Sequence, residues 1–331
     1  MSESGSVGES SDVTWAVDSV TVYGTLVRPV GEGPFPAVVL AAGSGPTDRD
    51  WNSPMLPGSN GSGRLIAERL ARAGIASVRY DKRGIGVHGK EQLPALLGKV
   101  SMAGFAEEFA GAVRVAADQE FIRDDRIFAL GNSEGTLHAL NYQLGKPAIS
   151  LRGLVLVSPP GRSVGAVARW QLAAQAATVP EGDAMMALYD AAVARFQAGE
   201  PAAPDPALPE GIRQLVASLE TPFNLPFTRE LWVADESELL GQVDVPVLIV
   251  IGDKDVQVDR VADGGPLQRA AEGHSNVSFL FPENMNHVLK QELRPRAELT
   301  PEAVAVSYSS PDTILDPEAV AGILAWLDDR S

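Results

Sequence analysis

The stretch IFALGNSEGTLHALNYQL, residues 127–144, joins an apolar run, a G-x-S-x-G motif and an amphipathic run without a break. The first part predicts a buried strand, and leucines at helical spacing in the last part predict a helix. A serine on such a tight turn is held in a strained conformation, and flanking glycines permit close approach of the chain. We therefore predict that Ser133 is a nucleophile. The competing interpretation is a glycine-rich turn in which Ser133 only caps the helix.

Strand and helix patterns alternate on both sides of this stretch. Short apolar runs predict strands at residues 36–42, 75–80, 154–157, 245–251 and 277–281, after β-type stretches at residues 13–17 and 20–27. Apolar residues at helical spacing predict helices at residues 62–73 and 102–118 and at the C-terminus, around Val320, Ile323, Leu324 and Leu327. This alternation is typical of an α/β fold with a mostly parallel central sheet and helices on both faces.

The alternation stops between residues 161 and 243, where helical patterns occur near residues 163–178, 183–198, 209–219 and 229–240. We interpret residues 161–243 as an inserted helical cap, and residues 12–160 and 244–331 as the core. Open α/β sheets bind ligands at the carboxyl ends of their strands, so we expect the cap over that edge. Residues 1–11 are small, polar and acidic, and we expect them to form a disordered N-terminus without the features of a signal peptide.

The composition excludes several classes of function. The chain of 331 residues has no cysteine, which rules out a disulfide scaffold, a thiolate metal site and a cysteine nucleophile. Its formal net charge of −16 would be repelled by phosphate backbones and anionic lipids, so we expect no nucleic-acid or membrane partner. No apolar run approaches the roughly 18–20 residues that span a bilayer. We expect a soluble, cytoplasmic protein.

A serine nucleophile needs a base, and the chain has four histidines. His138 lies in the predicted helix after Ser133, and His88 and His274 lie in polar, glycine-containing stretches typical of solvated loops. His287 follows the last predicted strand, in a loop expected at the carboxyl edge of the sheet. We therefore predict that His287 is the base.

The third partner should be a carboxylate that orients the imidazole. The strand at residues 245–251 runs directly into Gly252-Asp253-Lys254-Asp255. Either aspartate could serve, and spacing alone does not separate them. Paired aspartates here and at Asp124 and Asp125 are close enough to suggest a divalent cation, but turn formation explains them at least as well. The chain contains no H-E-x-x-H motif or Walker loop, so we expect no metal and no cofactor.

Several motifs together carry a resemblance that covers nearly the whole chain. They are YGTLVRP at residues 23–29, GSGPTDRD at 43–50, YDKRGIG at 80–86, GNSEG at 131–135, GDKDVQV at 252–258 and NHV at 286–288. On these motifs the chain resembles α/β-hydrolases of the esterase, dienelactone-hydrolase-like and serine-aminopeptidase-like group. The chain order serine, aspartate, histidine is the one expected for that fold.

The resemblance implies roles for particular residues. The acid of the family usually lies in a G-x-x-D-x-x-V pattern, which Gly252, Asp255 and Val258 match, so the resemblance favours Asp255, with Asp253 in reserve. It also implies an oxyanion hole made by the backbone N–H groups of Glu134 and Ser44. Many relatives have His-Gly in the second loop, where this chain has Ala42-Gly43.

Other polar and apolar residues are weaker candidates. Arg49 and Arg83 could bind a substrate carboxylate, but a structural network with neighbouring aspartates is the favoured interpretation. Side chains of the predicted cap could line an acyl site, although each is individually more typical of packing within the cap. These candidates are Trp170, Met185, Met186, Phe223, Phe227 and Trp232.

We predict a serine hydrolase that cleaves small-molecule carboxylic esters through an acyl-enzyme on Ser133, with His287 as base and Asp255 as orienting acid. Two alternatives stay open. The same residues could serve a peptidase, an amidase or a thioesterase, and a catalytically silent binding protein could share the fold. The sequence leaves a homodimer open.

Overall fold

The computed structural model describes residues 7–55, 58–310 and 312–331. The chain forms two compact units. The core unit consists of Met1–Gln92, Phe105–Gly161 and Glu236–Ser331, and the helical unit consists of Leu93–Gly104 and Arg162–Asp235.

The core unit contains one eight-stranded sheet with the strand order β1-β2-β4-β3-β5-β6-β7-β8. The first two strands pair antiparallel, as do β2 and β4, and all other neighbouring strands pair parallel. The strands are β1 (Glu9–Val17), β2 (Val20–Arg28), β3 (Phe35–Ala41), β4 (Ala76–Tyr80), β5 (Ile122–Asn132), β6 (Gly153–Val157), β7 (Val247–Val250) and β8 (Val277–Leu280). The predicted mostly parallel sheet is confirmed.

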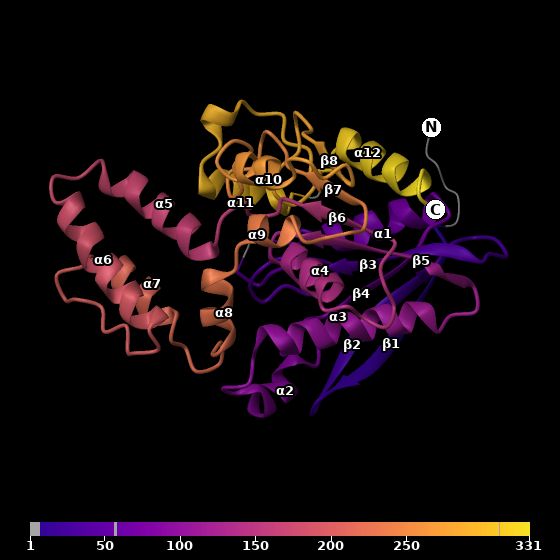
Figure 1. Cartoon of the computed structure of the whole chain (residues 1–331), viewed down its shortest axis with the longest axis horizontal. Helices are drawn as coiled ribbons and strands as arrows, with labels where there is room; N and C mark the ends of the chain where they lie inside the picture. The colour runs from indigo at the N-terminus through magenta and orange to yellow at the C-terminus, as the bar shows by residue number, and fades with distance from the viewer. Residues whose placement is uncertain (1–6, 56–57, 311) are drawn as a thin grey trace. The chain divides into compact units, whose positions relative to one another are not determined.

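Helices cover both faces of this sheet, as Figure 1 shows. Alternate residues of β3 belong to different apolar clusters. Val39 faces the cluster that includes Phe109 of α3 (Met102–Ala117), and Leu40 faces the cluster that includes Ile66 of α1 (Ser62–Arg72). This explains why the sequence of β3 is apolar throughout rather than alternating. The helices of the core unit are α1 (Ser62–Arg72), α2 (Gly89–Leu96, in part), α3 (Met102–Ala117, in part), α4 (Glu134–Leu144), α9 (Glu236–Leu240), α10 (Gly264–Ala270), α11 (Pro301–Tyr308) and α12 (Pro317–Asp328), with a 3-10 turn at Arg296–Glu298.

The N-terminal prediction needs a correction. Residues 1–6 lie outside the described residues, but β1 begins at Glu9, so residues 9–11 belong to the sheet. Their register runs from the pair Glu9 and Arg28 to the pair Val17 and Val20. Most side chains of β1 are exposed, because an edge strand can be held by backbone pairing without an apolar sequence. Composition therefore gave no signal for these three residues.

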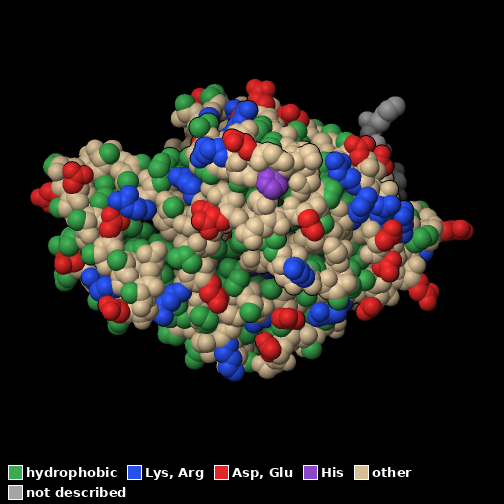
Figure 2. All heavy atoms as spheres, viewed as in Figure 1, with side chains coloured by type: hydrophobic (Ala, Val, Ile, Leu, Met, Phe, Trp, Pro, Cys, Tyr) green, Lys and Arg blue, Asp and Glu red, His purple; other side chains and the backbone are tan. Residues whose placement is uncertain are grey.

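The helical unit contains α5 (Val164–Ala176), α6 (Gly182–Gln197), α7 (Glu210–Ser218) and α8 (Phe227–Val233). Its own apolar core includes Tyr189, Phe196 and Val216. Among the described residues, no helix of either unit is long and apolar enough to cross a membrane. Figure 2 shows basic and acidic side chains interspersed on one face of the molecule.

The boundaries of this unit differ from those predicted for the cap. Residues 93–104 belong to it because the N–H of Phe227 donates to the carbonyl of Val100 at 2.9 Å, a contact between distant segments. Residues 236–243 belong instead to the core unit. There, the hydroxyl of Thr136 donates to the carboxylate of Glu236 at 2.7 Å.

Candidate active site

Ser133 lies on a strained turn between β5 and α4. Its backbone has φ 52° and ψ −125°, a region that residues with a side chain rarely adopt. A Cβ atom at Gly135 would lie 2.4 Å from the carbonyl oxygen of Ala41, and one at Gly131 would lie 2.4 Å from the carbonyl oxygen of Gly135. Both glycines are therefore required by close backbone contacts. The side chain of Ser133 does not make the capping hydrogen bond to α4 that the competing interpretation of the motif would require.

His287 and Asp255 form a buried hydrogen-bonded pair. The Nδ1 atom of His287 lies 2.8 Å from Oδ2 of Asp255, whose side chain is completely buried. The other carboxylate oxygen accepts the N–H groups of Gln257 at 2.8 Å and Val258 at 2.9 Å. Burial alone would raise the pKa of Asp255, but His287 and the hydrogen bonds outweigh it and lower that pKa. An ionised carboxylate on Nδ1 leaves Nε2 of the imidazole for proton transfer.

Asp253 has a different partner. Its carboxylate binds Nη1 of Arg260 at 2.7 Å and is partly exposed. The two aspartates that the spacing could not separate are thus distinguished by geometry, because only Asp255 contacts the imidazole of His287 in the described structure.

The loop that carries His287 is tied to the turn that carries Ser133. The side-chain amide of Asn132 donates to the backbone carbonyl of His287 at 2.9 Å. The same loop is held against the segment after β7, where the N–H of Lys254 donates to the carbonyl of Met285 at 3.2 Å. These contacts bring together the three distant segments that the sequence selected.

The loop after β3 lies against the same turn. A Cβ atom at Gly43 would lie 3.3 Å from the Cβ atom of Ser133. The Nζ atom of Lys82, just after β4, donates to the carbonyl of Gly43 at 2.6 Å and lies 3.1 Å from the carboxylate of Glu134. Ser44, the predicted second donor of the oxyanion hole, follows Gly43 directly. Sequence reasoning includes Lys82 only as part of the YDKRGIG motif at residues 80–86 and gives it no role.

Glu134 is buried with two cationic or protonatable partners. Besides Lys82, its carboxylate lies 3.2 Å from Nε2 of His138, which stacks on the ring of Phe105. Burial alone would raise the pKa of Glu134, but Lys82 and His138 outweigh this effect and lower the pKa to about 2. His138 is thus a partner of Glu134 within α4, and the histidine that contacts Asp255 is His287.

The arginines considered for substrate binding have partners within the chain. Arg49 binds Asp81 through Nη2 at 2.7 Å and Nε at 3.1 Å, and Arg83 forms a buried ion pair with Glu108. A guanidinium already paired in this way serves to join loops. The structure therefore agrees with the favoured interpretation of a structural network.

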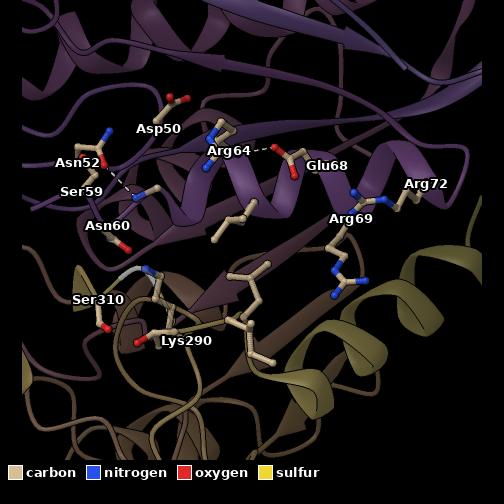
Figure 3. A pocket seen from close by; sticks show the side chains of 15 residues that line it. Asp50, Asn52, Ser59, Asn60, Arg64, Glu68, Arg69, Arg72, Lys290 and Ser310 are labelled. Carbon is tan, nitrogen blue, oxygen red and sulfur yellow. Dashed lines mark hydrogen bonds and ion pairs between the residues drawn. The ribbon is translucent and has the colours of Figure 1, made fainter. Parts of the chain in front are cut away.

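A polar cavity of about 460 Å³ borders the His287 loop at Lys290, and Figure 3 shows how its lining side chains lie. Lys290 is buried and donates to the carbonyl of Tyr308 at 2.6 Å. Its pKa is lowered to about 8 by burial and by Arg64. One of the dashed lines in Figure 3 marks the ion pair of Arg64 with Glu68. This cavity is separate from the residues selected as catalytic.

Within residues 7–55, 58–310 and 312–331, no three or more histidine, aspartate or glutamate side chains are grouped to hold a metal ion. Asp125, one of the paired aspartates noted in the sequence, lies between Arg123 and Arg126 at 3.5 and 3.6 Å.

The candidate acyl-site residues all belong to the helical unit. Met186 and Trp232 are buried in its apolar core, and Phe223 and Phe227 are half-buried. Trp170 is half exposed, with the guanidinium of a neighbouring arginine 4.9 Å from its ring. Met185 lines an apolar cavity of about 960 Å³ within this unit, which sequence reasoning did not predict. Substrate contact by these side chains stays a prediction.

The chain is similar in sequence to a known protein family and to a known esterase. The model of the family described as serine aminopeptidase, S33, matches residues 59–196. Esterase EstD of Thermotoga maritima is 26% identical over 274 residues, which cover 80% of this chain and 57% of that protein. The chain therefore spans less than two thirds of the length of this relative.

Solved structures share the fold. Proline iminopeptidase of Mycobacterium smegmatis has a TM-score of 0.55 at 16% identity, covering 97% of this chain and 98% of its own. An esterase of Pyrococcus furiosus has a TM-score of 0.50 at 18% identity, covering 83% of this chain and 82% of its own.

Gly135→Ala tests the requirement for close approach at the turn. The new Cβ would meet the backbone carbonyl of Ala41, so we expect a loss of about 1–3 kcal/mol in the free energy of unfolding. Gly211→Ala in α7 is the matched control, because nothing lies within 4 Å of its Cβ position. It should stabilise the protein by about 0.5–1 kcal/mol. Urea denaturation measures both, and equal effects of the two substitutions would contradict the prediction.

The lowered pKa of Asp255 predicts a pH dependence of stability. A carboxylate whose folded pKa is depressed stabilises the fold above its unfolded pKa, and this contribution disappears as pH falls through the folded pKa. Asp255→Asn should therefore be less stable than wild type near about pH 6, with a difference that shrinks below about pH 4. Urea denaturation of both proteins across this range measures the difference. A constant difference would show that the charge of Asp255 is not responsible.

Proposed function

We propose that the chain, which has the α/β-hydrolase fold, is a serine hydrolase that cleaves carboxylic esters. The observation that carries the proposal is the buried contact between His287 and Asp255, on a loop that is tied to the strained turn of Ser133. A protein that only binds a ligand has no need of this combination.

The proposed reaction has two halves. Nε2 of His287 takes the proton of Ser133 as Oγ attacks the ester carbonyl, and Asp255 stabilises the imidazolium. Collapse of the tetrahedral intermediate breaks the bond to the alcohol, which leaves with that proton, and an acyl-enzyme remains. Water, deprotonated by His287, then attacks the acyl carbonyl and forms a second tetrahedral intermediate. Collapse of this intermediate returns the proton from His287 to Ser133 and releases the acid.

The oxyanion of both intermediates would be held by backbone donors. We assign these to the N–H groups of Glu134 and Ser44. Glu134 begins α4, so its N–H is one of those that a helix leaves without an internal partner. The proximity of Gly43 to Ser133 supports the second donor, because Ser44 is the next residue. Loss of one such donor typically costs about 10²–10³-fold in kcat.

Ester substrates are favoured by the similarity to Esterase EstD, and peptide substrates by the similarity to the serine aminopeptidase family. An amidase or thioesterase would use the same residues. A panel of nitrophenyl esters of increasing acyl length, beside thioesters and aminoacyl amides, separates these activities. Turnover of the amides without turnover of the esters would favour the peptidase.

Substitutions of the proposed triad test the mechanism. We expect Ser133→Ala and His287→Ala to lower kcat by about 10⁶-fold and Asp255→Asn by about 10⁴-fold, since the first two remove the nucleophile or base. Asp253→Asn is the matched control and should retain activity close to that of wild type, because its partner is Arg260. Ester hydrolysis, followed as kcat and KM, measures all four.

Covalent labelling identifies the nucleophile independently of the substrate. A fluorophosphonate probe should label wild type stoichiometrically and leave Ser133→Ala unlabelled, as judged by intact-protein mass spectrometry. Labelling of Ser133→Ala equal to that of wild type would reject the assignment, and an unlabelled wild type would favour a binding protein.

A further inference from the structure

We propose that Lys82 is a positioning residue that orients and polarises the peptide group between Gly43 and Ser44, and thereby prepares one donor of the oxyanion hole. This inference rests on the proposed serine hydrolase function. It gives a role to the lysine of the YDKRGIG motif, whose neighbours Asp81 and Arg83 are engaged in other ion pairs.

The orientation follows from the planarity of the peptide bond. The carbonyl of Gly43 and the N–H of Ser44 belong to one trans peptide group, so they point in opposite directions. Nζ of Lys82 holds this carbonyl at 2.6 Å. Fixing the oxygen therefore fixes the direction of the N–H. A peptide that follows a glycine needs such a restraint because glycine leaves its backbone unusually free to rotate.

The charge of Lys82 acts on the same peptide. A hydrogen bond from an ammonium group is stronger than one between neutral groups, and it polarises the amide that accepts it. Water competes little with this contact, because the lysine side chain is 5% exposed and the ring of Phe105 lies 5.7 Å from Nζ. The N–H of Ser44 should therefore be a stronger donor than an ordinary amide.

Lys82 also compensates a negative charge beside the nucleophile. The carboxylate of Glu134, the residue after Ser133, is buried and lies 3.1 Å from Nζ of Lys82. Without a partner this carboxylate would oppose the negative charge that develops on the substrate oxygen. One ammonium group thus contacts both segments that supply the proposed backbone donors.

Lys82→Met tests the inference. We expect kcat for a nitrophenyl ester to fall by at least about tenfold but less than about 10³-fold, because a donor is misaligned rather than removed. KM should change little, since the oxyanion forms only after binding. The preference for an ester over its thionoester should also decline, because sulfur is a weak acceptor for the donors of the hole.

Two further variants distinguish a positioning role of Lys82 from an effect on folding and from an effect of its charge on Glu134. Arg83→Met removes another buried cation of the same motif and should leave kcat close to wild type wherever the variant is folded, because Arg83 pairs with Glu108. Lys82→Met combined with Glu134→Gln removes the carboxylate that has lost Lys82 as its partner and keeps the N–H of residue 134. This double variant should regain stability in urea denaturation. Its kcat should stay low, because the carbonyl of Gly43 is still released.

The outcomes are distinct. A folded Lys82→Met with kcat within about twofold of wild type would overturn the inference while leaving the proposed function intact. Full recovery of kcat in the double variant would also overturn it, because Lys82 would then only neutralise Glu134. A wild-type protein that neither reacts with the fluorophosphonate nor hydrolyses esters would overturn the proposed function, and the role of Lys82 with it.

Discussion

The strained backbone of Ser133 is the constraint on which the rest of the site depends. A conformation of this kind costs of the order of 1–3 kcal/mol and persists only where the surroundings over-determine it. Here the surroundings are backbone: α4 passes so close to β3 that residue 135 has no room for a Cβ atom, and the N–H of Ser133 donates to the carbonyl of Val157 at 2.9 Å. The turn is thus held by two neighbouring strands of the sheet.

Parallel pairing explains why the remaining groups collect around that turn. The strands β3, β4, β5, β7 and β8 point the same way, so the segments that follow them meet at one edge of the sheet. Gly43, Lys82, Ser133, Asp255 and His287 each follow one of these strands. Distant positions in the sequence become neighbours because the sheet aligns the ends of its strands, and short hydrogen bonds then fix the distances between them.

The sequence predicted what depends on local pattern, and it failed where a contact is non-local. The turn of Ser133 and the alternation of strands and helices are local features, and their prediction agrees with the structure. Spacing alone does not separate Asp253 from Asp255, and only the resemblance favoured Asp255. In the structure the two differ in their partners, Arg260 for Asp253 and His287 for Asp255, which no local rule connects. The boundary of the helical unit depends likewise on backbone pairing across more than a hundred residues. The role of Lys82 depends on two non-local contacts, to Gly43 and to Glu134, and in the sequence Lys82 appeared only as part of the YDKRGIG motif.

The buried ion pairs of the core unit follow from the same geometry. Asp81, Lys82 and Arg83 all come directly after β4, and each has an oppositely charged partner on another segment. Such pairs add little net stability, because the loss of hydration offsets the attraction between the charges. Apolar residues of similar size would hold the fold at least as well, but they could not fix the direction of a carbonyl or compensate a carboxylate. The buried charge of Lys82, which contacts both Gly43 and Glu134, is therefore better explained by the alignment of groups around Ser133 than by stability.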